Sequence, residues 1–72
     1  MTPVLVFVNE QPVHVEPGVT AAEAIAALDP ELAGKVRKGA ALLSDGRGIP
    51  LDPATKVYAG AILRAAVSAR AR

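Results

Sequence analysis

A capping box at Thr20 and Glu23 is the feature that most constrains the fold of this chain. In the tetrad Thr20-Ala21-Ala22-Glu23, the threonine hydroxyl can accept a hydrogen bond from the Glu23 amide, and the Glu23 carboxylate can accept one from the Thr20 amide. Apolar residues then recur at three- and four-residue spacing, at Ala21, Ala24, Ile25 and Leu28. This spacing, in a stretch of high helix propensity, predicts one amphipathic helix over residues 20–28.

The end of this helix is expected at Asp29-Pro30, because a residue that precedes proline disfavours the α conformation. Asp29 can cap one further turn over residues 30–33, which Gly34 is expected to stop. Residues 35–39 are then interpreted as a basic connector.

Two strands are predicted before the helix. Val4–Val8 is short, β-branched and apolar on both faces, as a central strand would be. After the turn residues Asn9-Glu10-Gln11, residues 13–16 alternate apolar with polar, which predicts a hairpin partner. Its valines, Val13 and Val15, are expected inside, and His14 and Glu16 in solvent.

Three further strands are predicted after the helix. Residues 40–44 lead into the glycine-rich turn Asp45-Gly46-Arg47-Gly48, and residues 49–51 return as a short strand. Pro50 places that strand at an edge, because proline cannot donate to a β-ladder. Residues 62–67 form the last strand, in which Leu63, Ala65 and Val67 alternate with Ile62, Arg64 and Ala66. The set that contains Arg64 is expected to face solvent.

The predicted order is hairpin, helix, hairpin, final strand. A sheet of four to five strands needs a cover for its apolar face, and the helix is the element available to supply it. A helix that links two strands of one sheet must cross over that sheet, which places the late strands beside the first hairpin. The sequence therefore predicts an α+β fold of the β-grasp type, with a mixed sheet of four to five strands and one main helix packed across it. We expect residues 1–72 to form a single domain with residues 68–72 as a C-terminal tail.

Composition narrows the range of functions. The chain has 72 residues, no cysteine and a net charge of +1, so disulfides and thiolate metal sites are excluded and no strong attraction to nucleic acid or membrane is expected. Phe7 and Tyr58 are its two aromatic residues, too few for a platform that stacks bases. The start of the chain lacks the pattern of a signal peptide, and no stretch approaches the length of a membrane span, so a cytoplasmic protein is expected.

No residue pattern indicates catalysis. His14 and Glu16 share a strand face but have no neighbouring partners of the kind that an active site needs. Ser44 and Ser68 have no base placed to activate them. The Asp45-Gly46-Arg47-Gly48 turn joins two strands and does not open a helix, so it lacks the features of a phosphate loop. We expect no enzyme activity and predict no catalytic, cofactor or metal site.

Two segments resemble a known superfamily. Phe7-Val8-Asn9-Glu10-Gln11-Pro12-Val13, followed by Pro17-Gly18-Val19-Thr20, looks like the opening hairpin and helix cap of the thiamine and molybdopterin sulfur-carrier proteins. Val57-Tyr58-Ala59-Gly60-Ala61-Ile62-Leu63 is similar to the segment that precedes and begins their last strand. The resemblance implies a ubiquitin-like protein of bacterial type, used as a modifier or sulfur carrier.

The resemblance also implies how such a protein works. Its C-terminal tail is recognised by an activating enzyme, a conjugating enzyme or a processing peptidase, and lysines such as Lys35, Lys38 and Lys56 offer amines for chain formation. The family ends in Gly-Gly, whereas the tail here consists of Ser68, Ala69, Arg70, Ala71 and Arg72. Three alternatives stay open: conjugation without glycine, trimming to a small residue such as Ala69, or no conjugation.

A partner-binding patch on the sheet is the second candidate site. In ubiquitin-like domains the open sheet face binds partners, and the candidate residues here are Leu42, Leu43, Ile62, Arg64 and Ala66. One of the two adjacent leucines is expected beside the outward residues of the last strand. The alternative, that the alternation slips at a bulge and these residues are core, stays open. A non-covalent interaction or assembly module is accordingly the rival function, and the oligomeric state is not predicted.

Overall fold

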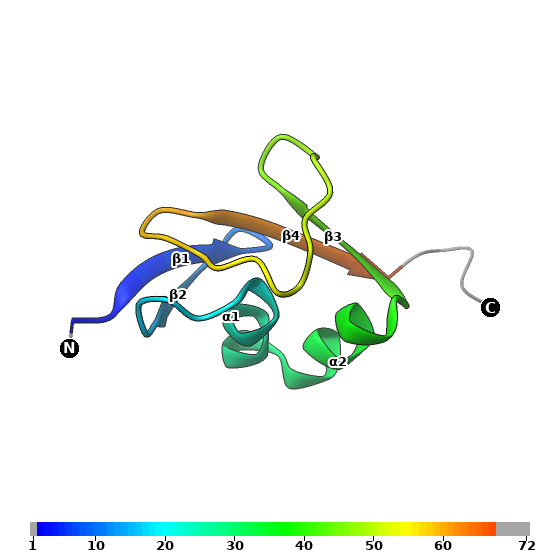
Figure 1. Cartoon of the computed structure of the whole chain (residues 1–72), viewed down its shortest axis with the longest axis horizontal. Coiled ribbons are helices and arrows are strands. Elements are labelled where there is room, and N and C mark those ends of the chain that lie inside the picture. The colour runs from blue at the N-terminus through cyan, green and yellow to red at the C-terminus, as the bar shows by residue number, and fades with distance from the viewer. Residues whose placement is uncertain (1, 68–72) are drawn as a thin grey trace.

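The computed structural model describes residues 2–67, which form four strands and two helices. In chain order the elements are β1 (Val4–Val8), β2 (Gln11–Val15), α1 (Ala21–Leu28), α2 (Pro30–Lys38), β3 (Ala41–Asp45) and β4 (Ile62–Val67). Both helices lie on the same side of the sheet (Figure 1). The predicted α+β class is confirmed, but the helical layer contains two helices where one main helix was expected.

The strands form one mixed sheet in the order β2-β1-β4-β3. β1 and β4 are parallel neighbours in its centre, and each pairs with an antiparallel outer strand. The chain reaches β4 from β1 through the helices, which is the crossover that a parallel pair requires. β1 is thus a central strand, as its apolar sequence predicted.

The core lies between the sheet and the helices. Val6 and Val8 of β1 and Ile25 of α1 are its largest fully buried side chains. Val13 and Val15 join this core while His14 and Glu16 are exposed, so the predicted alternation of the hairpin is confirmed. The hairpin turn is tighter than expected, because Asn9 and Glu10 both take positive φ values of 50° and 70° and β2 begins directly at Gln11.

The capping box at the start of α1 is confirmed. The Glu23 amide donates to the Thr20 hydroxyl at 3.2 Å, and the Thr20 amide donates to the Glu23 carboxylate at 2.8 Å. Two more amides of this first turn donate to loop carbonyls, Ala21 to Thr55 and Ala22 to Pro53. The loop between β3 and β4 thereby holds the start of α1.

The predicted stop at Gly34 is wrong. α2 passes through Gly34 and ends at Gly39, whose φ of 80° is the left-handed conformation of a helix C-cap. The buried residues Ala33 and Val36 explain the difference, because their three-residue spacing holds the helix on the core beyond the glycine. The expected basic connector is therefore the last part of α2.

The segment after β3 is also different from the prediction. Residues 49–51 form no strand, and their pairing with β3 is one isolated bridge between Ser44 and Pro50. The turn before them is fixed by the Asp45 carboxylate, which accepts from the amides of Arg47 and Ile49. The described sheet therefore has four strands. Within residues 2–67, no helix combines the length and the apolar character that a membrane crossing requires.

Candidate interaction surface

The sheet face opposite the helices carries the candidate site. On β4, Leu63 and Ala65 are buried against the helices, whereas Ile62, Arg64 and Ala66 are exposed on the other face. The predicted alternation is thus confirmed at these positions. Val67 is an exception: it was expected inside but is 50% exposed, because β4 ends there at the rim of the sheet (Figure 1).

The two adjacent leucines of β3 separate onto opposite faces. Leu42 is 69% exposed and belongs to the candidate surface. Leu43 is 6% exposed and lies in the core, so its assignment to a partner-binding patch is wrong. The physical reason is the two-residue period of a strand, which allows only one of two neighbours on each face.

Strand register brings the outward side chains together. Leu42 lies opposite Ala66, Ser44 opposite Arg64, and Phe7 of β1 beside Ile62. We define the open-face patch as Phe7, Leu42, Ile62, Arg64 and Ala66. Phe7 was not among the sequence-predicted residues, although its position between the buried Val6 and Val8 is the signal that would have found it.

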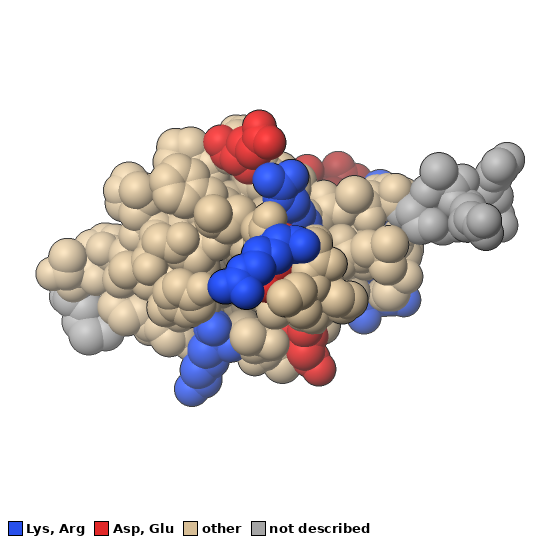
Figure 2. Space-filling model, turned by 90° about the horizontal axis from the view of Figure 1, so that it is seen from above, with Lys and Arg blue, Asp and Glu red and all other residues tan. Residues whose placement is uncertain are grey.

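Figure 2 is a view onto this side of the molecule. Most of the surface is formed by uncharged residues, and Lys or Arg side chains lie near its middle. Exposed aliphatic residues beside an arginine, as Leu42, Ile62 and Arg64 are here, are typical of a protein interface, where arginine is enriched and lysine depleted.

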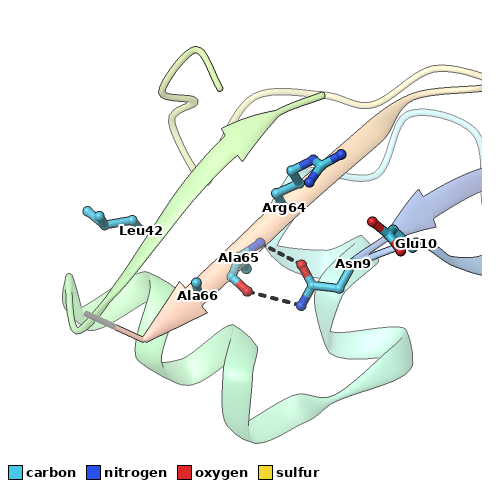
Figure 3. Close-up of a pocket in the computed structure, with 6 residues that line it drawn as sticks. All are labelled: Asn9, Glu10, Leu42, Arg64, Ala65 and Ala66. Atoms are coloured by element: carbon cyan, nitrogen blue, oxygen red, sulfur yellow. Dashed lines mark hydrogen bonds between the residues drawn. The ribbon is translucent and has the colours of Figure 1, made fainter. Parts of the chain in front are cut away.

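A shallow depression lies at one end of the patch, where the hairpin turn meets β4. Its lining consists of Asn9, Glu10, Leu42, Arg64, Ala65 and Ala66 (Figure 3). Asn9 shapes it: its side-chain oxygen accepts from the Ala65 amide at 2.9 Å, and its side-chain nitrogen donates to the Ala65 carbonyl at 3.0 Å. The Asn9 side chain therefore continues the pairing with β4 after β1 has ended at Val8.

Arg64 is the charged member of the open-face patch. It lies two residues from Ile62 and two from Ala66, so its neighbours on the same strand face are aliphatic. Among residues 2–67 its guanidinium takes part in no side-chain hydrogen bond or ion pair, and in Figure 3 no interaction joins it to Glu10. The carboxylate of Glu10 lies at the rim of the same depression.

The other sequence-predicted residues are spread over the surface. Lys35, Lys38 and Lys56 are exposed, and the first two lie on α2, away from the sheet. No group of three or more metal-binding side chains is found among residues 2–67. The tail residues Ser68, Ala69, Arg70, Ala71 and Arg72 lie outside the described residues.

Comparison of the chain with protein-family models, curated proteins and solved structures finds no match in any of the three.

Proposed function

We propose that this chain is a ubiquitin-like β-grasp domain that works by binding a protein partner through the open face of its sheet. Support for the fold assignment comes from the strand order β2-β1-β4-β3, the parallel central pair and the helices on one face. The sequence predicted a mixed sheet with its late strands beside the first hairpin and one main helix packed across it. The proposed activity is non-covalent binding, without catalysis.

One observation carries the proposal: the outer face of the sheet exposes aliphatic side chains. Leu42 and Ile62 are 69% and 46% exposed, and they lie on the same face as Phe7. Single exposed apolar residues are ordinary, but a group on one flat face is typical of an interaction surface. Burial of such a face against a partner would release water from it and stabilise the complex.

The test uses proteins encoded beside this gene as candidate partners. Binding would be measured by titration calorimetry with the wild-type chain, with Leu42→Ser and with Ala27→Ser, a matched change on the exposed side of α1. We expect Leu42→Ser to weaken binding by about tenfold or more and Ala27→Ser to leave it unchanged. A partner whose affinity depends on Ala27 and not on Leu42 would contradict the proposal.

A second function, that of a ubiquitin-like modifier or sulfur-carrier-like protein, is favoured by the position of β4. This strand lies in the centre of the sheet and ends at the half-exposed Val67, so the chain continues from the rim of the domain. A modifier needs its last strand to end at such a place, because an activating enzyme, a conjugating enzyme or a peptidase acts on the residues that follow it.

Intact mass spectrometry distinguishes the two functions. The chain would be incubated with candidate activating enzymes and ATP, beside a variant that lacks residues 68–72. A covalent adduct of the full chain that the variant does not form would support the modifier. Undiminished partner binding by the shortened, folded variant, without any adduct, would support the non-covalent module.

A further inference from the structure

We propose that the open-face patch receives an amphipathic helix of the partner, which aims a carboxylate at Arg64 between two aliphatic side chains. This inference rests on the proposed function, because it specifies the chemistry of the partner that the patch would bind. Three observations support it: the charge of Arg64, the few free hydrogen-bonding groups at the sheet edges, and the spacing of the outward residues along β4.

The charge of Arg64 favours a carboxylate on the partner. A partner that covers Ile62 and Ala66 also removes water from the guanidinium between them, and a desolvated charge without a counter-ion is costly. Figure 3 draws no hydrogen bond between Arg64 and Glu10, the acidic residue in the same depression, so a carboxylate of the partner would offset this cost. Arginine is suited to this, since its fork of N–H donors matches a carboxylate with two parallel hydrogen bonds. A second copy of the chain would instead bring another arginine to the patch.

The edges of the sheet disfavour a partner that adds a strand. Val8 and Gln11 flank the two-residue turn and form a hydrogen-bonded pair. The backbone of the next residue, Pro12, therefore points away from β1, toward the free edge of β2. Proline has no N–H that could donate to an added strand there. The outer edge of β3 is partly occupied, because the Leu51 amide donates to the Leu43 carbonyl and the Asp45 amide donates to the Ile49 carbonyl. A partner that lies across the face must satisfy its own backbone, which a helix does.

The spacing along β4 sets the sequence pattern of that helix. Outward residues of a strand are about 6.6 to 6.8 Å apart, so Ile62, Arg64 and Ala66 are separated by two steps of nearly equal length. Four residues of a helix rise about 6 Å. The patch would therefore be matched by a helix with an aliphatic residue, an acidic residue four positions later, and a second aliphatic residue four positions after that.

Glu10 is a second charged residue beside the open-face patch. Its carboxylate lines the same depression as Arg64 and would repel an incoming acidic side chain. The two residues should therefore act in opposite directions on an acidic partner. A patch that binds only by apolar contact would show no such opposition.

The probe is a synthetic alanine-based helical peptide with leucine, glutamate and leucine at the three positions, and its twin has glutamine in place of glutamate. Each would be titrated into the full-length chain and followed by the amide resonances of Leu42, Arg64 and Ala66. We expect saturable shifts at these amides and a dissociation constant about tenfold lower for the glutamate peptide. Arg64→Gln should abolish this preference and Glu10→Gln should increase it, whereas Arg37→Gln, on the exposed surface of α2, should leave it unchanged.

Three outcomes would overturn the inference. Equal affinity of the two peptides at the patch would remove the role of Arg64 while leaving the proposed binding face intact. Absence of shifts at these amides would show that the patch does not receive a helix of this pattern, and the calorimetric test with Leu42→Ser would then decide the proposed function separately. Concentration-dependent shifts without any peptide would identify a second copy of the chain as the occupant.

Discussion

Asn9 connects the turn of the first hairpin to the centre of the sheet. It has a positive φ of 50°, which asparagine tolerates better than most residues, and its side chain bonds both backbone groups of Ala65. One residue thus serves the turn and the pairing with β4. It also supports the depression beside Arg64.

We expect Asn9→Ala to lower the free energy of unfolding by about 2 kcal/mol or more, because it leaves two partly buried backbone groups of Ala65 without partners and because alanine tolerates a positive φ less well than asparagine. Urea denaturation measures this change. Asn9→Gly is the control: it keeps the backbone conformation and loses only the hydrogen bonds, so its loss should be smaller by about 1 kcal/mol. Equal, small effects of both variants would show that the bonds to Ala65 do not contribute.

The sequence predicted the turn at Asn9 but not its contact with Ala65. Turn residues are recognised from local preferences, whereas a hydrogen bond between residues 56 positions apart depends on where β1 ends relative to β4. Arg64 is the opposite case. Its outward position follows from a charged residue in an alternating strand, which is a local pattern, and the structure agrees.

At the scale of elements, α2 shows how tertiary packing overrides a local stop signal. Gly34 lies inside the helix, and a Cβ built on it would meet no atom within 4 Å apart from its chain neighbours and the backbone of its own helix. Gly39 also has open space around it, but its φ is 80°. These two glycines make a matched pair, because they differ in backbone conformation and not in room for a side chain.

We expect Gly34→Ala to raise the free energy of unfolding by about 0.5 to 1 kcal/mol, since alanine loses less backbone entropy in a helix. Gly39→Ala should lower it by about 1 kcal/mol or more, because the left-handed conformation is strained for a residue with a Cβ. Thermal and urea unfolding of both variants give the signs. Opposite signs are the required result, and a stabilising Gly39→Ala would refute the C-cap.

The capping box of α1 gives a prediction for pH. The pKa of Glu23 is held below its ordinary value of 4.5, chiefly by the hydrogen bond from the Thr20 backbone amide and then by the bond with its hydroxyl. A carboxyl whose pKa is lower in the folded chain stabilises the fold above its unfolded pKa, and this contribution is lost as the pH falls through the folded value.

The wild-type chain should therefore be more stable than Glu23→Gln above the ordinary pKa of 4.5, and the difference should shrink as the pH is lowered further. Urea unfolding of both proteins across this range, at constant ionic strength, measures the difference. A gap between wild type and variant that stays constant with pH would show that the ionised carboxylate does not contribute through the box.

At the scale of the whole molecule, the α+β class and the mixed sheet could be predicted because few arrangements suit one helical layer and two hairpin-like segments. The crossover rule places the late strands beside the first hairpin, and the structure has β4 next to β1. The predicted strand over residues 49–51 was wrong. The apolar pattern of these residues does not indicate that the Asp45 carboxylate accepts hydrogen bonds from the Arg47 and Ile49 amides and so fixes a turn. The chain also uses this long loop to hold α1, which no local pattern indicates.

The division of the molecule into a packed face and an open face leads to the last prediction. Leu42 and Leu43 are chemically identical neighbours that lie on opposite faces of β3, with 69% and 6% of their surfaces exposed. Leu43→Ala should lower the free energy of unfolding by about 2 to 4 kcal/mol, since it removes buried methyl groups and leaves a cavity. Leu42→Ala should change it by about 0.5 kcal/mol or less, because this side chain is already in water.

The same two variants connect stability to function. Circular dichroism during urea unfolding gives both free energies, and calorimetry with the partner gives both affinities. If the open face is the binding surface, Leu42→Ala should weaken binding although the domain stays fully folded. Leu43→Ala should weaken binding only to the extent that the chain unfolds. A large loss of stability from Leu42→Ala would instead mean that the side chain is covered within the domain, and the surface at the centre of the proposed function would not be open.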